Sequence, residues 1–352
     1  MFFRVFLCIL LFGIVVSAQL PLPLPREEKK SLVKVAVSPD RLTIAIARSG
    51  NTSVKRYGRV ELWDSESGQL RRTITGFDGP IWSMTFSRDG KSVVTVSTEH
   101  REQKVPTKVK DRDEKVFAEL KWWNTQSGEF IRRVSLELEK GVMSLEAAWS
   151  PNGDALALVE RYVVTRFTQM PERAAFGPRV FISGRDSVSE INLKLLDAQT
   201  GERRVKVEDA SRSLAGYHGL LYARLERPTF SPDGKLLAAV LGTDVTLWNT
   251  GTGKKAVTLK KMKGTPSAIA FSPDSRHVAV ASVKGKMPGG ESEITIWEVP
   301  NGRRVNQLTG RNDDISSLQF AFGGRALLIG SLQYERAGAT GTIKMWNVSE
   351  NR

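Results

Sequence analysis

The chain has 352 residues, of which 40% are hydrophobic, and its formal net charge at pH 7 is +14. This length and apolar content suffice for one large all-β domain or two smaller domains. The single cysteine, Cys8, excludes an intrachain disulfide, so the fold must depend on its hydrophobic core. A positive charge of this size favours anionic partners, although it could also serve only to keep the fold soluble.

The first residues have the pattern of a secretory signal peptide. A basic start that ends at Arg4 is followed by an apolar run, and Val16, Ser17 and Ala18 supply the small residues of a cleavage site. The apolar run is too short to span a bilayer comfortably. We therefore expect residues 1–18 to be removed, residues 19–352 to form the mature domain, and the protein to be exported (periplasmic, cell-envelope or secreted). An uncleaved signal that anchors the chain in a membrane is the alternative.

The stretch 230–254, FSPDGKLLAAVLGTDVTLWNTGTGK, combines three turns with two kinds of strand. Its opening SPDG is a turn signal, because proline presets φ and glycine supplies a positive φ. LLAAV is a short apolar run typical of a buried strand, whereas VTLW alternates. Gly253, five residues after Trp248, marks a further turn. The stretch therefore predicts two antiparallel strands with tight turns on either side.

This unit recurs along the chain, which is the signature of a repeat protein. Relatives of the SPDG turn occur at 37–40, 86–90, 149–153, 271–275 and 320–324. Alternating strands recur at 60–64, 120–124, 193–197, 294–298 and 343–347. Five residues after the Trp of each such strand, or after Leu196 in the third, is a residue suited to the left-handed conformation: Gly68, Gly128, Gly201, Gly253, Gly302 and Asn351.

Each copy predicts four antiparallel strands, which form one blade of a β-propeller. The residues FSPDG, LLAAV, VTLWN and TG resemble the WD-repeat family over nearly all of residues 31–352. The resemblance implies an all-β fold with one propeller of six four-stranded blades, with seven blades as the alternative. Trp-Asp itself occurs only at Trp63-Asp64, and the Gly-His pair of the family is missing. The chain is thus similar to a divergent, bacterial-style exported member of the family.

The two ends of the chain are predicted to close the ring together. The sixth copy has three strands, and Arg352 follows soon after the last of them, which leaves a sheet edge without a partner. We expect part of residues 19–31 to pair with residues 344–347 as the missing outer strand. The prolines of this segment are tolerable in an edge strand, but they also fit a polyproline-like linker.

Long connections predict a binding surface. The link between the second and third strand is minimal at 242–244, but it is long near 48–59, 98–117 and 161–189, with shorter expansions at 283–292 and 332–341. All of these links should leave the same face of a propeller, where loops on a rigid scaffold carry binding residues. They are rich in cations and aromatic residues, which contact polyanions or sugars through charge and stacking. The predicted partner-binding residues are Arg48, Lys55, Arg56, Tyr57, Arg59, Lys104, Lys108, Lys110, Arg161, Tyr162, Arg166, Arg173, Arg179 and Arg185.

No catalytic motif is found in the sequence. The three histidines lack metal-ligand spacing, and no Gly-x-Ser-x-Gly motif is present. We therefore predict a non-catalytic binding module without metal or cofactor, monomeric, that contacts a protein or an anionic surface polymer, with no specific nucleic acid. Contact with a membrane would occur only through an uncleaved signal. The alternative is a hydrolase or lactonase-type propeller with a metal at its axis, where Glu146 is the one acid expected on the innermost strands.

Overall fold

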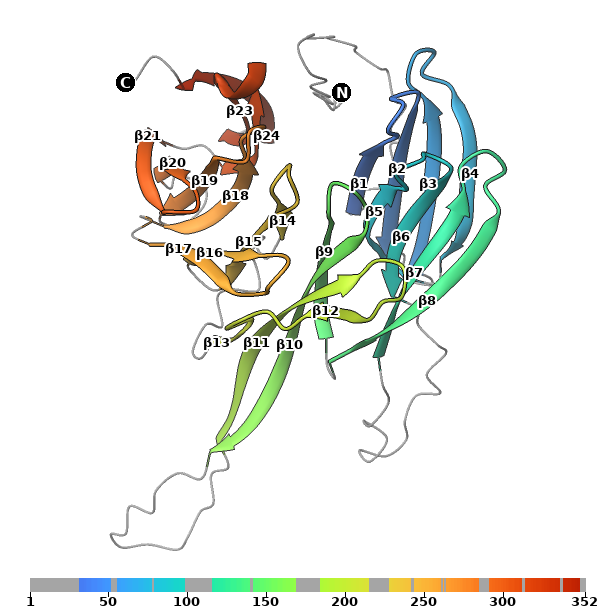
Figure 1. Ribbon diagram of the computed structural model, residues 1–352, viewed down its shortest axis with the longest axis horizontal. Helices are drawn as coiled ribbons and strands as arrows, with labels where there is room; N and C mark the ends of the chain where they lie inside the picture. The colour runs from blue at the N-terminus through green and yellow to red at the C-terminus, as the bar shows by residue number, and fades with distance from the viewer. Residues whose placement is uncertain are drawn as a thin grey trace, which may run out of the picture.

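The computed structural model describes residues 32–51, 56–77, 79–98, 116–139, 142–168, 184–214, 228–241, 244–260, 262, 264–284, 291–311, 314–335 and 338–348. Within these ranges the chain forms six antiparallel sheets, and Figure 1 shows them following one another around a ring. The predicted all-β propeller with six blades is therefore confirmed for this part of the chain. We number the sheets one to six in chain order and call each a blade.

In the first three blades the strands lie in sequence order from the inside of the ring outwards. Blade one contains β1 (Leu32–Val37), β2 (Thr43–Asn51), β3 (Arg56–Asp64) and β4 (Leu70–Phe77). Blade two contains β5 (Ile81–Phe86), β6 (Ser92–Thr98), β7 (Val116–Asn124) and β8 (Phe130–Leu138). Blade three contains β9 (Val142–Trp149), β10 (Ala155–Thr168), β11 (Gly184–Asp197), β12 (Arg203–Val205) and β13 (Ser211–Leu214).

The last three blades repeat this order. Blade four contains β14 (Thr229–Phe230), β15 (Leu236–Leu241), β16 (Asp244–Asn249) and β17 (Lys255–Leu259). Blade five contains β18 (Thr265–Phe271), β19 (His277–Lys284), β20 (Glu291–Glu298) and β21 (Arg303–Arg311). Blade six contains β22 (Asp314–Ala321), the 3-10 turn η3 (Phe322–Gly324), β23 (Ala326–Glu335) and β24 (Gly338–Asn347). The innermost strands β1, β5, β9, β14, β18 and β22 contact one another in turn.

In blades one, two, four and five the turns related to SPDG share one hydrogen-bonding pattern. In blade four, the Ser231 hydroxyl donates to Asp233 Oδ1 at 2.6 Å and accepts from the backbone N–H of Leu236 at 2.9 Å. Gly234 closes the turn with φ of 72°, the left-handed region that glycine enters most cheaply. The same place is taken by Arg41 and Ser275 in blades one and five, with φ of 68° and 59°. Two copies therefore hold a side chain in a conformation that disfavours it.

The blades pack by one repeated contact. The apolar face of one blade, such as Leu193 and Leu195 in blade three, covers Trp248 on the facing side of the next blade. Trp123, Leu196, Trp297 and Trp346 occupy the same place in the other four inter-blade clusters. Full burial of one large apolar side chain contributes about 1.5–3 kcal/mol. Since this contact occurs at each of these interfaces, the repeated Trp position is a main source of the ring's stability.

Blade three departs from the predicted four-strand pattern. Its outer strand is divided into β12 and β13, which pair with different parts of β11. Between them, the Glu208 carbonyl accepts the indole N–H of Trp248 at 2.7 Å, and the Glu208 backbone N–H donates to Gly253. Asp209 has φ of 48°, which turns the chain back to the sheet. The break thus lets blade three bind the Trp and the glycine turn of blade four.

Blade six has three strands in the described part of the chain, and its outermost strand is β24. Ile343 and Met345 on β24 are exposed, at 46% and 63%. The segment predicted to cover this edge, residues 19–31, lies outside the described residues, as do the predicted signal peptide and Asn351. Closure of the ring by this segment therefore stays a prediction.

Candidate functional site

The predicted binding face is formed by the connections between the second and third strand of each blade. Because the blades share one strand order and touch through their inner strands, these connections leave from the same end of each sheet. β6 ends at Thr98 and β7 begins at Val116, whereas β15 ends at Leu241 and β16 begins at Asp244. Figure 1 shows the long strands β10 and β11 extending beyond the other blades. The blades therefore differ from one another mainly at this end.

Ten of the fourteen predicted partner-binding residues have no described side chain. Lys55, Lys104, Lys108, Lys110, Arg173 and Arg179 lie outside the described residues. Arg56 and Tyr57 belong to β3, Arg166 to β10 and Arg185 to β11, each close to where its strand meets the connection. The remaining four predicted residues, Arg48, Arg59, Arg161 and Tyr162, have described side chains.

Arg48 and Arg59 belong to one ionic cluster within blade one. Arg48 Nε donates to Glu61 Oε2 at 3.0 Å, and Arg59 Nε donates to Glu61 Oε1 at 2.9 Å. The indole N–H of Trp63 donates to Glu61 Oε2 at 3.3 Å. Burial disfavours the charged carboxylate, but the hydrogen bonds from Arg59 and Arg48 lower the pKa of Glu61 below its ordinary 4.5. Arg48 is 2% exposed, so its guanidinium belongs to the interior of the blade rather than to its surface.

Arg161 and Tyr162 lie where β10 leaves the blade, and both are half-buried. The Tyr162 hydroxyl donates to Glu190 Oε2 at 3.1 Å on the paired strand β11. Burial, together with this hydrogen bond, raises the pKa of Tyr162 to about 12. Next to them, Lys194 Nζ lies 2.7 Å from the fully buried Glu160 Oε1. Tyr162 therefore ties the base of the long β10–β11 hairpin together.

The axis of the ring holds an ion pair. Lys34 Nζ on β1 lies 3.2 Å from Glu146 Oε2 on β9, so the pair joins the innermost strands of blades one and three. Glu146 is the acid expected at the axis from the sequence. The ammonium group of Lys34 lies against its carboxylate, where a metal ion would have to bind. In the described part of the chain, no group of three or more His, Cys, Asp or Glu side chains is placed to hold a metal ion.

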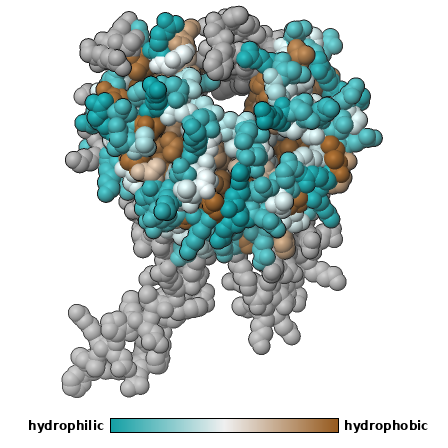
Figure 2. Space-filling view, in the orientation of Figure 1, coloured by the Kyte–Doolittle hydropathy of each residue, from teal (hydrophilic) through white to brown (hydrophobic). Residues whose placement is uncertain are grey.

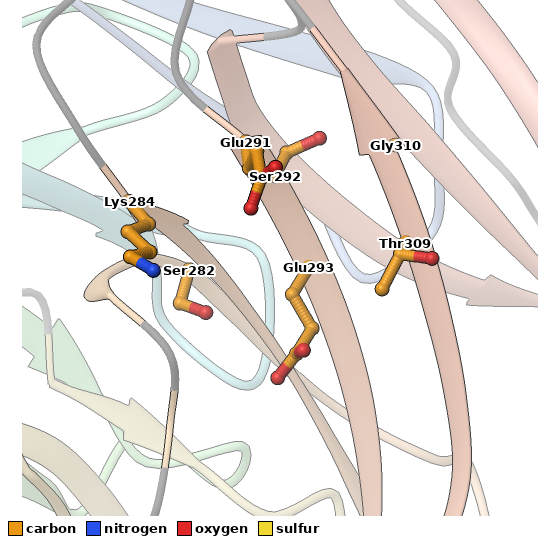
Figure 3. Close-up of a pocket in the computed structure, with 7 residues that line it drawn as sticks. All are labelled: Ser282, Lys284, Glu291, Ser292, Glu293, Thr309 and Gly310. Atoms are coloured by element: carbon orange, nitrogen blue, oxygen red, sulfur yellow. The ribbon is translucent and has the colours of Figure 1, made fainter.

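A polar pocket of about 420 Å³ lies in blade five, at the end where β19 connects to β20. Figure 3 shows Ser282 and Lys284 on β19, Glu293 on the adjacent strand β20, and Thr309 on β21. Among the described residues, Glu291, Ser292 and Gly310 also line it. The sequence marked 283–292 as a short expansion but did not reveal this pocket. The available signal was the contrast between the short link of blade four and the longer strands of blade five.

The comparisons with known proteins agree with this architecture. The family model described as "WD domain, G-beta repeat" matches residues 68–101, which contain β4, β5 and β6. The fold is similar to a chain in a crystal structure of the mitotic checkpoint complex, with a TM-score of 0.53 and 16% identity over 92% of this chain and 79% of that chain. Among curated proteins no similar sequence is found. The repeat match at residues 68–101 and the six antiparallel sheets together support a β-propeller fold that contains a WD repeat.

Proposed function

We propose that the protein is an exported, non-catalytic scaffold whose binding end, formed by the connections between the second and third strands, contacts a partner protein or an anionic surface polymer. The observation that carries the proposal is the unequal length of these connections on an otherwise repeated ring. WD-repeat propellers are in general interaction scaffolds, and one of the similar solved chains comes from a protein complex. In the described residues, no helix is long and apolar enough to cross a membrane.

The surface chemistry supports a polar contact. The connections at 98–117 and 161–189 are rich in lysine and arginine, and the whole chain carries +14. Figure 2 shows a face on which hydrophilic residues predominate and hydrophobic ones are scattered in small areas. Cationic side chains on such a surface would speed association with an acidic partner and make binding depend on salt.

The ion pair at the axis supports a non-catalytic role over a metal-dependent hydrolase. A divalent cation at Glu146 would have to displace Lys34 and lie close to its positive charge. Like charges at such a distance repel each other, and a single carboxylate supplies too few ligands for tight binding. The proposed protein acts as a monomer, and its export depends on the signal peptide at residues 1–18.

The test compares two variants with the same loss of charge. The first replaces Lys104, Lys108 and Lys110 with Ser at the binding end. The second replaces Lys91, Lys254 and Arg276 with Ser; these three residues are exposed at the opposite end of the blades. Partners captured from an extract of the protein's own cell envelope are identified, and their affinity is measured over a salt series. The proposal expects weaker binding and a smaller salt dependence for the first variant only, since surface charges are screened within about 10 Å at 0.1 M salt. Equal effects of the two variants would show that net charge, not the binding end, governs the interaction.

A further inference from the structure

The pocket in blade five exists because its neighbour is short. β15 and β16 of blade four have 6 residues each, whereas β19 and β20 have 8 each. Trp248 and Trp297 hold the same repeat position, so Glu293 corresponds to Asp244, the first residue of β16. The last residues of β19 and the first residues of β20 therefore extend past the end of blade four. Their polar side chains are not covered by its apolar face.

The residues of the pocket are aligned across three strands. Ser282 pairs with Glu293, and Glu293 pairs with Thr309. Lys284 pairs with Glu291 one step closer to the connection. Paired residues of antiparallel strands project to the same face of a sheet, so these five side chains share one face. It is the face on which Trp297 packs against blade four.

The floor of the pocket is rigid. Glu293 is 5% exposed, its Oε2 accepts from Gln307 Nε2 at 2.6 Å, and its Oε1 accepts from the Thr295 hydroxyl at 3.3 Å. A carboxylate oxygen has two lone pairs, so Glu293 can still accept a hydrogen bond from a ligand.

One hydroxyl of the pocket lies beside its carboxylate floor. Ser282 is 3% exposed, lines the pocket and pairs with Glu293 on the adjacent strand. A hydroxyl both donates and accepts, so Ser282 and Glu293 together offer a donor and acceptors to a ligand. Blade two has the equivalent pair, Ser97 and Glu119, but there Lys121 Nζ lies 3.3 Å from Glu119 and no pocket remains described.

We propose that this pocket binds a neutral, hydroxyl-rich ligand, namely a sugar unit. The lining offers donors and acceptors together: Lys284 donates, Glu291 and Glu293 accept, and the hydroxyls of Ser282 and Thr309 do both. A cation would leave the donors unused, and an anion would meet two carboxylates. Sugar hydroxyls satisfy both kinds of group without net charge. The volume of 420 Å³ falls within the range of about 300–1,000 Å³ seen for ligand pockets.

The test is a saturation-transfer NMR titration of the purified full chain with glucose, galactose, mannose and N-acetylglucosamine at millimolar concentration. Glucosamine, glucuronate and arginine serve as cationic, anionic and amino-acid probes. We expect at least one neutral sugar to bind with a millimolar dissociation constant and to bind better than its charged counterparts. Binding of none of the four sugars, or tighter binding of arginine than of any sugar, would overturn the proposal.

Matched variants locate the site. Ser282→Ala and Thr309→Val each remove one hydroxyl, and each should raise the dissociation constant about fivefold, which is the loss of one hydrogen bond. Ser97→Ala and Ser135→Ala make the equivalent changes in blade two and should leave the affinity unchanged. Thermal melting shows which variants are folded, and Thr309→Val is at an exposed position that tolerates the change. Sugar binding that is unaffected by both Ser282→Ala and Thr309→Val would place the site elsewhere. The proposal is independent of partner binding by the basic connections, which the envelope capture tests separately.

Discussion

The repeated Trp position allows a sharp test of how the blades are held together. Trp248 and Trp297 are both buried, at 1% and 7% exposure, and each packs on the apolar face of the preceding blade. They differ in one respect. The indole N–H of Trp248 donates to the Glu208 carbonyl at 2.7 Å, whereas the indole N–H of Trp297 has no hydrogen-bond partner in the part of the chain that the structure describes.

Replacing each Trp with Phe removes the same atoms but has different consequences for hydrogen bonding. Trp248→Phe loses a hydrogen bond worth about 1 kcal/mol, while Trp297→Phe removes a buried donor that costs about 1 kcal/mol to leave unpaired. We therefore expect Trp248→Phe to be more destabilising than Trp297→Phe by about 2 kcal/mol. Unfolding entropy for 352 residues amounts to about 0.7 kcal/mol per degree, so the melting temperatures should differ by about 3 °C.

The assay is thermal unfolding followed by far-UV circular dichroism, with urea unfolding as a second measurement. A Trp297→Phe protein as unstable as Trp248→Phe would show that the hydrogen bond to Glu208 contributes nothing. It would also mean that the hydrogen bond from Trp248 to Glu208 does not explain why the outer strand of blade three is divided.

Four further predictions test other parts of the structure. Arg41→Gly should raise the melting temperature, because it relieves a left-handed conformation that costs an L-residue about 1–2 kcal/mol. The greater backbone entropy of glycine in the unfolded chain offsets part of this gain. Ser275→Gly should raise the melting temperature less, since it also removes the hydrogen bond from the Asp233 N–H to Ser275 Oγ. Donation from the Ser38 and Ser87 hydroxyls lowers the pKa of Asp40 and Asp89 below 3.8 in the folded state. The stabilisation by these carboxylates is therefore complete above that value and is lost as the pH falls through the lowered pKa. The melting temperature should decrease less steeply between about pH 5 and 2 for Ser38→Ala and Ser87→Ala than for the parent protein. Deleting residues 19–30 should lower the melting temperature and promote self-association if this segment closes blade six, and a monomeric variant of unchanged stability would contradict closure. The exported protein should begin at Gln19, and an intact mass that includes residues 1–18 would show a retained anchor.

The fold was predictable because its determinants are local and repeated. A turn that needs positive φ requires glycine at one position, and Gly68, Gly128, Gly201, Gly253 and Gly302 all have φ between 67° and 77°. The alternation of strands such as VELWD fixes which residues face the next blade. Six copies of such signals reinforce one another, so an error in one copy does not change the architecture.

The features missed by sequence depend on contacts between distant residues. The outer strand of blade three reads as one polar segment, but the turn of blade four at Gly253 divides it at Glu208. Arg48 was predicted at the binding end from its position beside a connection. Arg48 lies on the same face of β2 as Ile44 and Ile46, which are buried. This spacing of two residues is the signal that places its side chain in the interior of the blade. The pocket of blade five depends on the length of a neighbouring blade, which no single repeat contains.

The polar positions on the Trp-bearing face explain how a repeated scaffold acquires individual sites. Two residues before the Trp position stand Glu61, Lys121, Lys194, Thr246, Thr295 and Lys344, and four residues before it stand Arg59, Glu119, Asn192, Asp244, Glu293 and Thr342. The positions between them are apolar in every copy, and in blades one to five they pack against the next blade. In blade one, Glu61 at such a position is buried and pairs with Arg48. In blade five, Glu293 is also buried and accepts from Gln307, but it lies beside the short hairpin of blade four and lines a pocket with Ser282 and Thr309. A short hairpin in one blade therefore leaves room for a pocket on its neighbour without any change to the core.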